Sequence, residues 1–307
     1  MPRVSVILPF YNRAASLERC VRSVLAQSFA DFEIVAVDDA STDESARVIT
    51  ALGDPRIRVL RHETNCGPSG ARNTALRAAA GEVFAFIDSD DEWLPGKLAA
   101  QIAMLDGPPG CDLCGCEYFR VADGVERRVE LPRDVKWAEW LHFRCELGSG
   151  TTLTVRRHVV DAVGMLDETF RVYEDWDWVL RMVLRFRYDV VREPLARVHV
   201  GAPRPPEIVA ASAAQFLRKH EAEFRRLGPA HWRRVRSEHF EAVAALAFSQ
   251  RHFALGFRSL LKSWAAAPAR NPLRLGALAL APVDALCGTS LLRRAIELQR
   301  RWRGEAG

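Results

Sequence analysis

The stretch VFAFIDSDDEW, residues 83–93, decides the fold of this chain. Its first five residues are apolar and mostly aromatic or β-branched, which predicts a buried strand over Val83–Ile87. An acidic run, residues 88–92, follows the strand at once. Open α/β sheets bind ligands beyond the carboxyl ends of their strands. The stretch therefore predicts an α/β fold with acidic side chains at a ligand-binding edge.

The segments upstream repeat this pattern. Three more strand-like runs occur there, and segments whose apolar residues have helical spacing lie between them. This alternation indicates a largely parallel sheet covered by helices on both faces. We expect one of these helices to begin with a capping box formed by Ser41 and Glu44. The predicted strands are Val4–Leu8, Glu33–Val37 and Ile57–Leu60, and the apolar helix positions are Leu17, Val21, Val24, Leu25, Val48, Ile49 and Leu52, with a further helix over Ser69–Ala80.

Beyond residue 105 the pattern loosens. We expect strands over Leu113–Val121 and Thr151–Val155, and helices over Trp137–Phe143 and Asp175–Phe186. The run APRPPE, residues 202–207, is the best domain boundary because its prolines oppose regular structure. The sequence thus predicts an α/β domain over residues 1–204 and a helical region over residues 205–307.

Charge is unevenly distributed between these two regions. Residues 205–307 hold 17 Lys and Arg against 8 Asp and Glu, a net charge of +9. The remaining 26 basic and 31 acidic residues give residues 1–204 a net charge of −5. A basic segment is attracted to anionic lipids, nucleic acids or acidic proteins.

Cysteine usage and the N-terminal residues predict a cytoplasmic protein. The chain has seven cysteines, an odd number, and Val4–Leu8 is too short for the apolar core of a signal peptide. The most apolar long window, Leu275–Leu292, contains Pro282 and Asp284, so we expect no membrane-spanning helix there.

Acidic residues follow two of the predicted strands. Asp38 and Asp39 come after one, and Asp88 and Asp90 after another, and we expect these two strand ends to be adjacent. Crowded carboxylates are costly unless a cation compensates their charge, and Mg²⁺ or Mn²⁺ binds one or two carboxylates together with diphosphate oxygens. For Asp43 and Glu92, in contrast, a role as solvated turn residues or helix caps is favoured.

Five segments, in order, resemble the motifs of family 2 glycosyltransferases. The resemblance covers residues 3–200 and implies the GT-A fold, a nucleotide-binding α/β/α sandwich with a mixed, mainly parallel sheet. Residues 205–307 lie outside it and are expected to form a C-terminal helical extension. The segments are VSVILPFYNR (4–13), VAVDDASTDES (35–45), NCGPSGARNTAL (65–76), FAFIDSDDEWLP (84–95) and YEDWDWVLR (173–181).

The resemblance implies a binding site for a nucleoside-diphosphate sugar. The backbone at Pro9 and the ring of Tyr11 match the wall beside the base, and Asp39 matches the residue that accepts a hydrogen bond from the base, typically uracil. Arg72 matches a position that contacts the nucleotide. Asp88 and Ser89 are likewise expected to contact the nucleotide-sugar donor.

The resemblance also implies the chemistry. Asp88 and Asp90 match a pair that binds a divalent metal, Mn²⁺ or Mg²⁺, with Asp90 the more direct ligand, and His199 matches a histidine near that metal. Asp175 matches the general base. A metal at the diphosphate stabilises the leaving group, and one base on the far side of the anomeric carbon gives inversion.

The expected partners are the nucleotide-sugar donor and a glycan or glycolipid acceptor, in the synthesis of bacterial cell-surface polysaccharide or glycolipid, and no nucleic acid. A Q-x-x-R-W pattern is absent after Asp175, which indicates single rather than processive additions. The basic, amphipathic segment from Phe253 to Trp264 and the clusters at 291–294 and 300–303 are compatible with peripheral attachment at the inner face of the membrane or with packing on the catalytic domain.

Three other functions are alternatives. A nucleotidyltransferase is disfavoured because PFYNRAAS is no glycine-rich phosphate loop, and a phosphatase because the D-x-D follows the fourth strand rather than the first. A non-catalytic nucleotide-sugar-binding or scaffold protein remains a third possibility.

Some motifs are better explained by packing. Cys111, Cys114 and Cys116 lack a matching pair of zinc ligands and are expected to be buried in a strand. Residues 148–150 lack the third glycine of a dinucleotide-binding loop. Trp93, Trp137 and Trp140 fit core packing at least as well as stacking on sugar rings.

Overall fold

The computed structural model describes residues 1–145 and 149–268. The chain divides into two compact units, Met1–Ala202 (unit 1) and Pro203–Gly307 (unit 2). Unit 1 contains the sheet, and the described part of unit 2 is helical.

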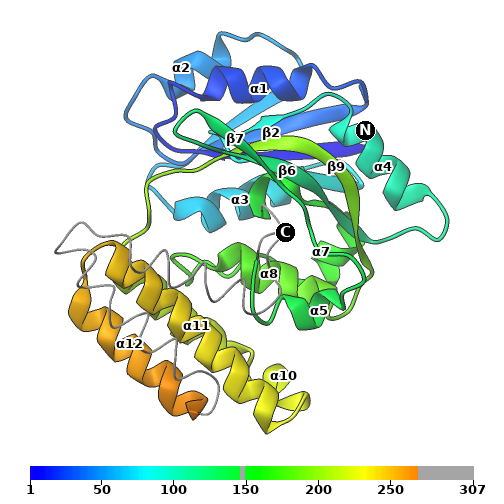
Figure 1. Cartoon of the computed structure of the whole chain (residues 1–307). Helices are drawn as coiled ribbons and strands as arrows, with labels where there is room; N and C mark the ends of the chain where they lie inside the picture. Colours follow the sequence, from blue (N-terminus) through cyan, green and yellow to red (C-terminus); the bar gives the residue numbers. More distant parts are fainter. Residues whose placement is uncertain (146–148, 269–307) are drawn as a thin grey trace. The chain divides into compact units, whose positions relative to one another are not determined.

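Within the described residues, nine strands form one mixed sheet in the order β3-β2-β1-β4-β8-β6-β9-β5, with β7 paired to β6 (Figure 1). The half formed by β3, β2, β1 and β4 is parallel throughout, whereas β8 runs antiparallel to both of its neighbours. The strands are β1 (Val4–Phe10), β2 (Phe32–Asp38), β3 (Ile57–Arg61), β4 (Val83–Phe86), β5 (Glu92–Trp93), β6 (Leu113–Ala122), β7 (Val125–Val129), β8 (Thr154–Arg156) and β9 (Tyr188–His199).

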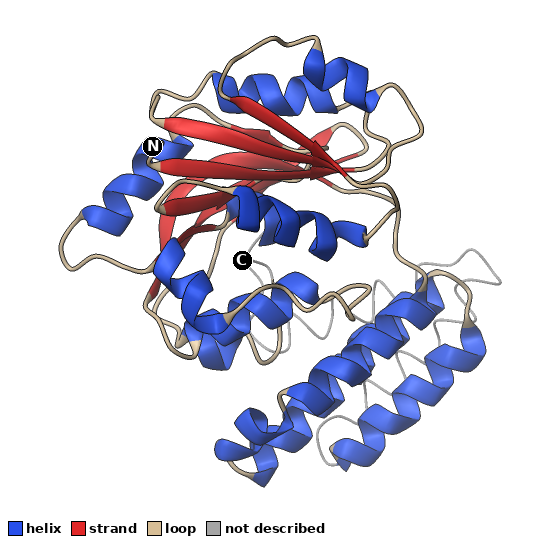
Figure 2. Ribbon diagram, turned by 180° about the vertical axis from the view of Figure 1, so that it is seen from behind, coloured by secondary structure: helices blue, strands red, loops and turns tan. Residues whose placement is uncertain are grey.

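Helices cover both faces of this sheet (Figures 1 and 2). Val4, Val6 and Leu8 of β1 point into a core shared with α1, α2 and α4. On the opposite face, Trp178 of α8 packs edge-on against Phe86 of β4, with ring centroids 5.4 Å apart. The helices of unit 1 are α1 (Leu17–Leu25), α2 (Ser45–Thr50), α3 (Gly67–Ala78), α4 (Lys97–Asp106), α5 (Trp137–Trp140), α6 (Ser149–Thr152), α7 (Arg157–Val163) and α8 (Glu174–Val183).

The expected α/β class with a mixed sheet between helical layers is confirmed. The four predicted N-terminal strands are present. The continuous apolar runs of β1, β2 and β4 are buried on both faces of the parallel sheet, whereas β3 at its edge is largely exposed. Cys114 and Cys116 are fully buried on β6, and Cys111 is buried just before it, as expected of packing residues.

Three local predictions are wrong. Ser41 caps no helix, since α2 begins only at Ser45 and the Ser41 hydroxyl instead accepts the backbone N–H of Asn12. The expected strand over Thr151–Val155 is a helical turn, α6, followed by the short strand β8. The proline-rich boundary is partly regular, because α9 begins at Pro206, where a missing N–H and a fixed φ suit the first helical turn.

Unit 2 is helical over its described residues. The hydroxyls of Ser237 on α11 and Ser263 on α12 are 2.8 Å apart, and Gly256 leaves room for the ring of Phe248 between these two helices. In the described parts of the chain, no helix combines the length and apolar character needed to cross a membrane. The helices are α9 (Pro206–Lys219), α10 (Glu221–Arg226), α11 (Pro229–Ser249) and α12 (Phe253–Ala266).

Candidate active site

The carboxyl ends of β2, β1 and β4 lie side by side at one edge of the sheet. The expectation that the ends of β2 and β4 are direct neighbours is wrong, because β1 runs between them. A strand joined by a crossover can pair on either side of β1, so chain order alone does not fix the neighbour. As a result Pro9 is buried near the end of β1, and Tyr11, 43% exposed, follows the strand between Asp39 and Asp88 in the strand order.

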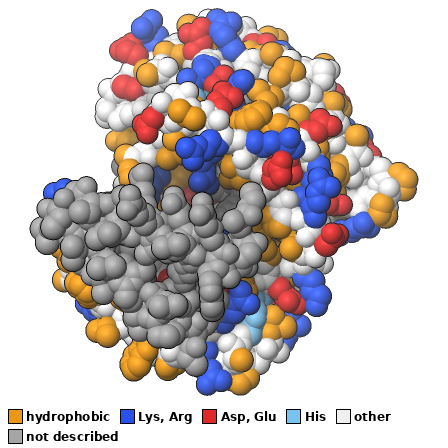
Figure 3. Space-filling view, in the orientation of Figure 1, with side chains coloured by type: hydrophobic (Ala, Val, Ile, Leu, Met, Phe, Trp, Pro, Cys, Tyr) orange, Lys and Arg blue, Asp and Glu red, His pale blue; other side chains and the backbone are white. Residues whose placement is uncertain are grey.

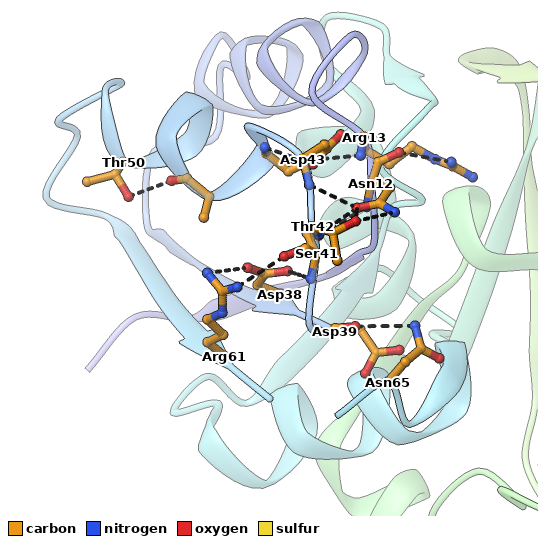
Figure 4. A network of polar contacts seen from close by, with 12 residues as sticks. Asn12, Arg13, Asp38, Asp39, Ser41, Thr42, Asp43, Thr50, Arg61 and Asn65 are labelled. Atoms are coloured by element: carbon orange, nitrogen blue, oxygen red, sulfur yellow. Dashed lines mark hydrogen bonds and ion pairs between the residues drawn. The ribbon is translucent and has the colours of Figure 1, made fainter. Parts of the chain in front are cut away.

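The loops after β1 and β2 hold each other in place (Figure 4). Asn12 has a φ of 52°, and its side-chain Oδ1 accepts the backbone N–H of Thr42 at 2.8 Å. Asp43 accepts the backbone N–H groups of Ala14 and Ser45. The structural role expected for Asp43 is therefore confirmed, and the two loops form one frame next to Asp39.

Asp39 is buried and hydrogen-bonded on both carboxylate oxygens. Its Oδ1 accepts the backbone N–H of Cys66 at 2.8 Å and the ring Nδ1–H of His62 at 2.7 Å, the tautomer that a carboxylate selects. Its Oδ2 accepts the backbone N–H of Gly67 at 2.8 Å. The Asp39 carboxylate is thus fixed against the start of α3. The side-chain amide of Asn65 also donates a hydrogen bond to the backbone carbonyl of Asp39 (Figure 4).

The acids after β4 have basic partners. Asp88 Oδ1 accepts a hydrogen bond from Arg72 at 2.6 Å, and Asp90 Oδ2 lies 3.4 Å from the guanidinium of Arg13. About a third of each of these two acidic side chains is exposed. Ser89 is buried, and its carbonyl accepts the hydroxyl of Ser16.

These acids are chemically suited to a hard divalent ion. Mg²⁺ and Mn²⁺ prefer oxygen ligands and need only one or two carboxylates when phosphate oxygens complete the shell. The absence of a side chain at Gly150 leaves room for the Asp88 carboxylate, because a Cβ atom there would overlap it. Asp88 and Asp90 therefore fit the metal that the resemblance implies.

Among the described residues, the one cluster of three metal-capable side chains lies elsewhere, at Asp39, His62 and Cys66, whose ligand atoms are within 4.8 Å of one another. Asp39 is already saturated on Oδ1 by hydrogen bonds, and a thiol with an imidazole suits zinc rather than a diphosphate-bound magnesium or manganese. His62 and Cys66 lie near Asp39 because both hydrogen-bond its carboxylate and fix its position, so no metal is needed to explain this cluster.

Asp91 is a structural residue of the acidic run. Its carboxylate hydrogen-bonds the hydroxyl of Thr151 and accepts the backbone N–H of His199 at 2.7 Å. Burial, together with the neighbouring charge of Asp88, raises the pKa of Asp91 to about 8. The ring Nε2 of His199 lies 3.2 Å from Glu92. The structure thus brings His199 to the acidic run through Asp91 and Glu92.

Arg72 connects the acids after β4 with the start of α8. Its guanidinium is buried and contacts Asp88 and, at 3.3 Å, Glu174. Burial acts to lower the pKa of Arg72, but the carboxylates of Asp88, Glu174 and Asp175 more than offset this and raise it. Residues that lie 16 and 102 positions from Arg72 in sequence therefore meet at one cation.

Glu174 is a site residue that sequence reasoning missed. Burial and the adjacent charge of Asp175 raise the pKa of Glu174 to about 7. Asp175 is half-buried in the first turn of α8, where its Oδ1 accepts the backbone N–H of Trp176 at 2.6 Å. The only available signal for Glu174 was its place beside Asp175, whereas its burial and its contact with Arg72 arise from the tertiary fold. Asp175 thus lies within the same electrostatic cluster as Asp88.

The fold and this edge define an α/β protein whose acidic side chains gather at the carboxyl ends of parallel strands, and comparison with known sequences gives the family. The model of glycosyl transferase family 2 matches residues 5–164, so the chain belongs to this family and is a glycosyltransferase.

Three named proteins illustrate the sequences that are similar to this chain. It is 38% identical to Escherichia coli WfaP, named a UDP-Glc:α-D-GlcNAc-diphosphoundecaprenol β-1,3-glucosyltransferase, over 66% of this chain and 80% of WfaP. It is 38% identical to the putative colanic acid biosynthesis glycosyl transferase WcaA of E. coli K12, over 60% of this chain and 67% of WcaA. The match to WfgD of E. coli, at 42% identity, spans 33% of this chain and 40% of WfgD.

Solved structures share the fold. Residues 1–349 of S. aureus TarS in complex with UDP-GlcNAc align with a TM-score of 0.59 at 21% identity, over 94% of this chain and 92% of that one. The mannosyltransferase PcManGT of Pyrobaculum calidifontis, in complex with GDP-Man and Mn²⁺, aligns with a TM-score of 0.53 at 22% identity, over 98% of this chain and 88% of that one. The GT-A fold that the motifs imply is therefore confirmed.

Proposed function

We propose that this chain transfers a sugar from a nucleoside-diphosphate sugar, UDP-linked, to an acceptor hydroxyl, with a divalent metal ion and with inversion at the anomeric carbon. The observation that carries the proposal is the contact of Arg72 with both Asp88 and Glu174. Through this contact the carboxylates suited to a metal and the expected base, Asp175, belong to one cluster, as a single displacement requires.

The hydrogen bonds of Asp39 favour uracil over guanine. A carboxylate oxygen accepts about two hydrogen bonds, and Oδ1 already has two while Oδ2 has one. One acceptor position therefore remains. Uracil presents a single ring N–H between two carbonyls, whereas guanine presents an adjacent N–H and amino group that together need both carboxylate oxygens.

The acids after β4 and Arg72 are assigned to the diphosphate. When bound by Asp88 and Asp90, Mn²⁺ or Mg²⁺ supplies Lewis-acid stabilisation of the departing diphosphate. Ion pairs with Asp88 and Glu174 fix the position of the Arg72 guanidinium at the same edge of the sheet. Pro9 lies near the end of β1, and Tyr11 directly follows this strand. In the strand order both lie between Asp39 and the acids after β4, where a nucleotide extending from base to diphosphate must pass.

Asp175 is assigned as the base. One of its oxygens is occupied by a backbone N–H, and no partner of the other oxygen is found among the described residues. That oxygen is available to accept the proton of the acceptor hydroxyl as the new glycosidic bond forms. Attack from the side opposite the diphosphate inverts the anomeric carbon.

The acceptor is proposed to be a glycan or glycolipid of bacterial surface polysaccharide synthesis. WfaP and WfgD carry names that specify a diphosphoundecaprenol-linked acceptor, and WcaA is named for colanic acid synthesis. For such an acceptor we propose a reaction in the cytoplasm at the inner face of the membrane.

Peripheral membrane attachment of residues 205–307 is a further part of this proposal. The basic clusters 291–294 and 300–303 lie outside the described residues. On α12, the side chains of Phe257, Leu261 and Trp264 are each more than 40% exposed beside the basic Arg258 and Lys262. Flotation with anionic liposomes tests the attachment, and equal recovery with neutral liposomes would argue against it.

A thermal-shift panel of nucleoside diphosphates tests donor binding. UDP with Mn²⁺ is expected to raise the melting temperature, and the affinity for UDP is expected to exceed that for GDP at least tenfold, because GDP leaves one of its donors unpaired. Absence of any metal-dependent shift would overturn the metal and diphosphate assignments. An equal shift with GDP would overturn only the assignment of the base.

Three variants separate the roles of the acids. Asp175→Asn is expected to lower sugar transfer by about 10²–10⁴-fold while UDP binding persists. Asp90→Asn is expected to abolish the Mn²⁺-dependent shift. Asp123→Asn, in the exposed turn between β6 and β7, serves as the control and is expected to leave both unchanged. If all three proteins bind UDP and neither they nor the wild type transfer sugar, the chain is a nucleotide-sugar-binding protein.

A further inference from the structure

A basic pocket lies in unit 2, outside the segment matched by the family model. It has a volume of about 280 Å³ and is formed where α9, α10 and α11 meet. Each of these helices contributes one arginine to its lining, Arg218, Arg225 and Arg236 respectively. Among the described residues, Glu221 is the one carboxylate of the lining. We call these residues, with Trp232, the arginine pocket.

The positive charge of the arginine pocket is only partly neutralised. Glu221 accepts a hydrogen bond from Arg225 at 2.6 Å, one turn apart along α10. Neither Arg218 nor Arg236 has a carboxylate partner among the described residues. The lining therefore has an excess of two positive charges.

Two of the three guanidinium groups lie close to the same aromatic ring on the floor of the pocket. Arg225 and Arg236 both place their guanidinium carbon 5.5 Å from the centre of the Trp232 ring. Trp232 is itself 7% exposed and stacks on Phe224 with 17° between the ring planes, so the floor is fixed by packing. Both guanidinium groups thus lie within cation–π distance of one ring, and only that of Arg225 has a carboxylate partner in the described part of the chain, so the positive charge of Arg236 is available to a bound anion.

The chemistry of these side chains favours a phosphoryl group. Guanidinium groups bind phosphate oxygens through paired N–H donors, and two uncompensated arginines match a dianion. A volume of about 280 Å³ lies below the range of roughly 300–1,000 Å³ typical of pockets for drug-sized ligands. A phosphate or diphosphate group therefore fits better than a complete nucleotide sugar.

We infer that the arginine pocket is a second anion site that binds the diphosphate group of a diphosphate ester, with the apolar Leu217 and Phe240 of its lining beside the group that the ester carries. The inference does not depend on the proposed function, because every residue of the pocket belongs to unit 2 and the proposed donor-site residues belong to unit 1.

Calorimetry with geranyl diphosphate, in the presence of saturating UDP and Mn²⁺ to fill the donor site, tests the inference. Arg236→Gln and Arg218→Gln are each expected to weaken binding at least tenfold. Arg233→Gln, an exposed arginine of α11 that does not line the pocket, is expected to change it less than twofold. Equal affinity in all three variants would overturn the inference, whether or not UDP binds.

Two additional arms make the outcome specific. Glu221→Gln is expected to tighten binding severalfold, since it frees Arg225, whereas a purely structural effect would not increase affinity. Inorganic pyrophosphate and geraniol distinguish the sources of binding. Pyrophosphate is expected to bind more weakly than the ester but with the same dependence on Arg236, and binding of geraniol as tight as that of the ester would refute an anion site.

Discussion

At the scale of single residues, Arg72 decides how the acids of this chain can act together. Its buried guanidinium contacts Asp88 at the end of β4 and Glu174 at the start of α8. An unpaired charge buried to this degree would cost several kcal/mol, so the two carboxylates and the cation stabilise each other. Asp175, next to Glu174, thereby belongs to the same charge network as the proposed metal ligands.

Glu174→Gln should reveal this coupling in the pH dependence of transfer. The pKa of Glu174 is raised to about 7, so the group gains its charge as pH rises through that value. The charge makes the neighbouring Asp175 a stronger base. We expect about a three- to tenfold lower rate for Glu174→Gln at pH 8, and loss of the component of the pH–rate profile near pH 7. A profile that keeps its inflection near pH 7 would assign it to another group.

The sequence predicted Asp88, Asp90 and, through the family resemblance, Arg72, but it did not predict the contacts of Arg72 or the roles of His62 and Glu174. Asp88 and Asp90 directly follow an apolar strand, so a local pattern was enough to mark them. The roles of His62, Arg72 and Glu174 depend on partners 23, 16 and 102 positions away. No local spacing specifies such contacts, since they arise only when β2, β4, α3 and α8 are assembled.

At the scale of secondary-structure elements, the structure predicted from local sequence pattern agrees with the folded structure for most of unit 1. The apolar spacing of α1 and the continuous runs of β1, β2 and β4 describe buried surfaces correctly. Predictions failed where side chains are used by distant partners. Thr151 bonds Asp91 through its hydroxyl and the Trp93 ring through its carbonyl, which holds a helical turn where β-branched residues favoured a strand.

Lys97 on α4 allows a test of how burial affects an element. Its side chain is fully buried, with Nζ 2.6 Å from Gln101 and 4.1 Å from the centre of the Trp93 ring. Burial lowers its pKa to about 8, whereas the ordinary value is 10.5. The folded chain thus binds this proton more weakly than the unfolded chain, and the free energy of unfolding rises as pH increases from about 8 towards 10.5.

Lys97→Met is therefore expected to stabilise the protein by about 1–3 kcal/mol at pH 7, where the buried charge is present, and by less at pH 10. Gln101 keeps its hydrogen bond from Thr154 in this variant. Urea unfolding at the two pH values measures the difference. An equal effect of the substitution at pH 7 and pH 10 would show that the charge of Lys97 does not limit stability.

At the scale of the whole molecule, the chain consists of two compact units that differ in architecture and charge. Basic and acidic side chains are interspersed on the face of unit 1 drawn in Figure 3, in keeping with the ion pairs of this unit. The fold class followed from strand and helix periods, but the strand order did not, since pairing on either side of β1 satisfies the same apolar pattern.

All residues proposed for the donor site lie in unit 1. Residues 1–202 produced alone are therefore expected to bind UDP and Mn²⁺ with an affinity within about threefold of the full chain, as calorimetry can measure. If the shortened chain is folded by circular dichroism but binds UDP more than tenfold more weakly, unit 2 contributes to the donor site.

The outer position of β3 has a consequence for the behaviour of the protein in concentrated solution. In the sheet order β3 has β2 on one side and no described strand on the other, so its backbone is a potential template for a strand of another molecule. Two of its five residues are arginines, Arg58 and Arg61, and a fibril that stacked copies of this strand would have to stack those charges. The edge thus opposes self-association, and apolar substitutions at Arg58 and Arg61 would be the ones to avoid when the enzyme is engineered for high-yield production.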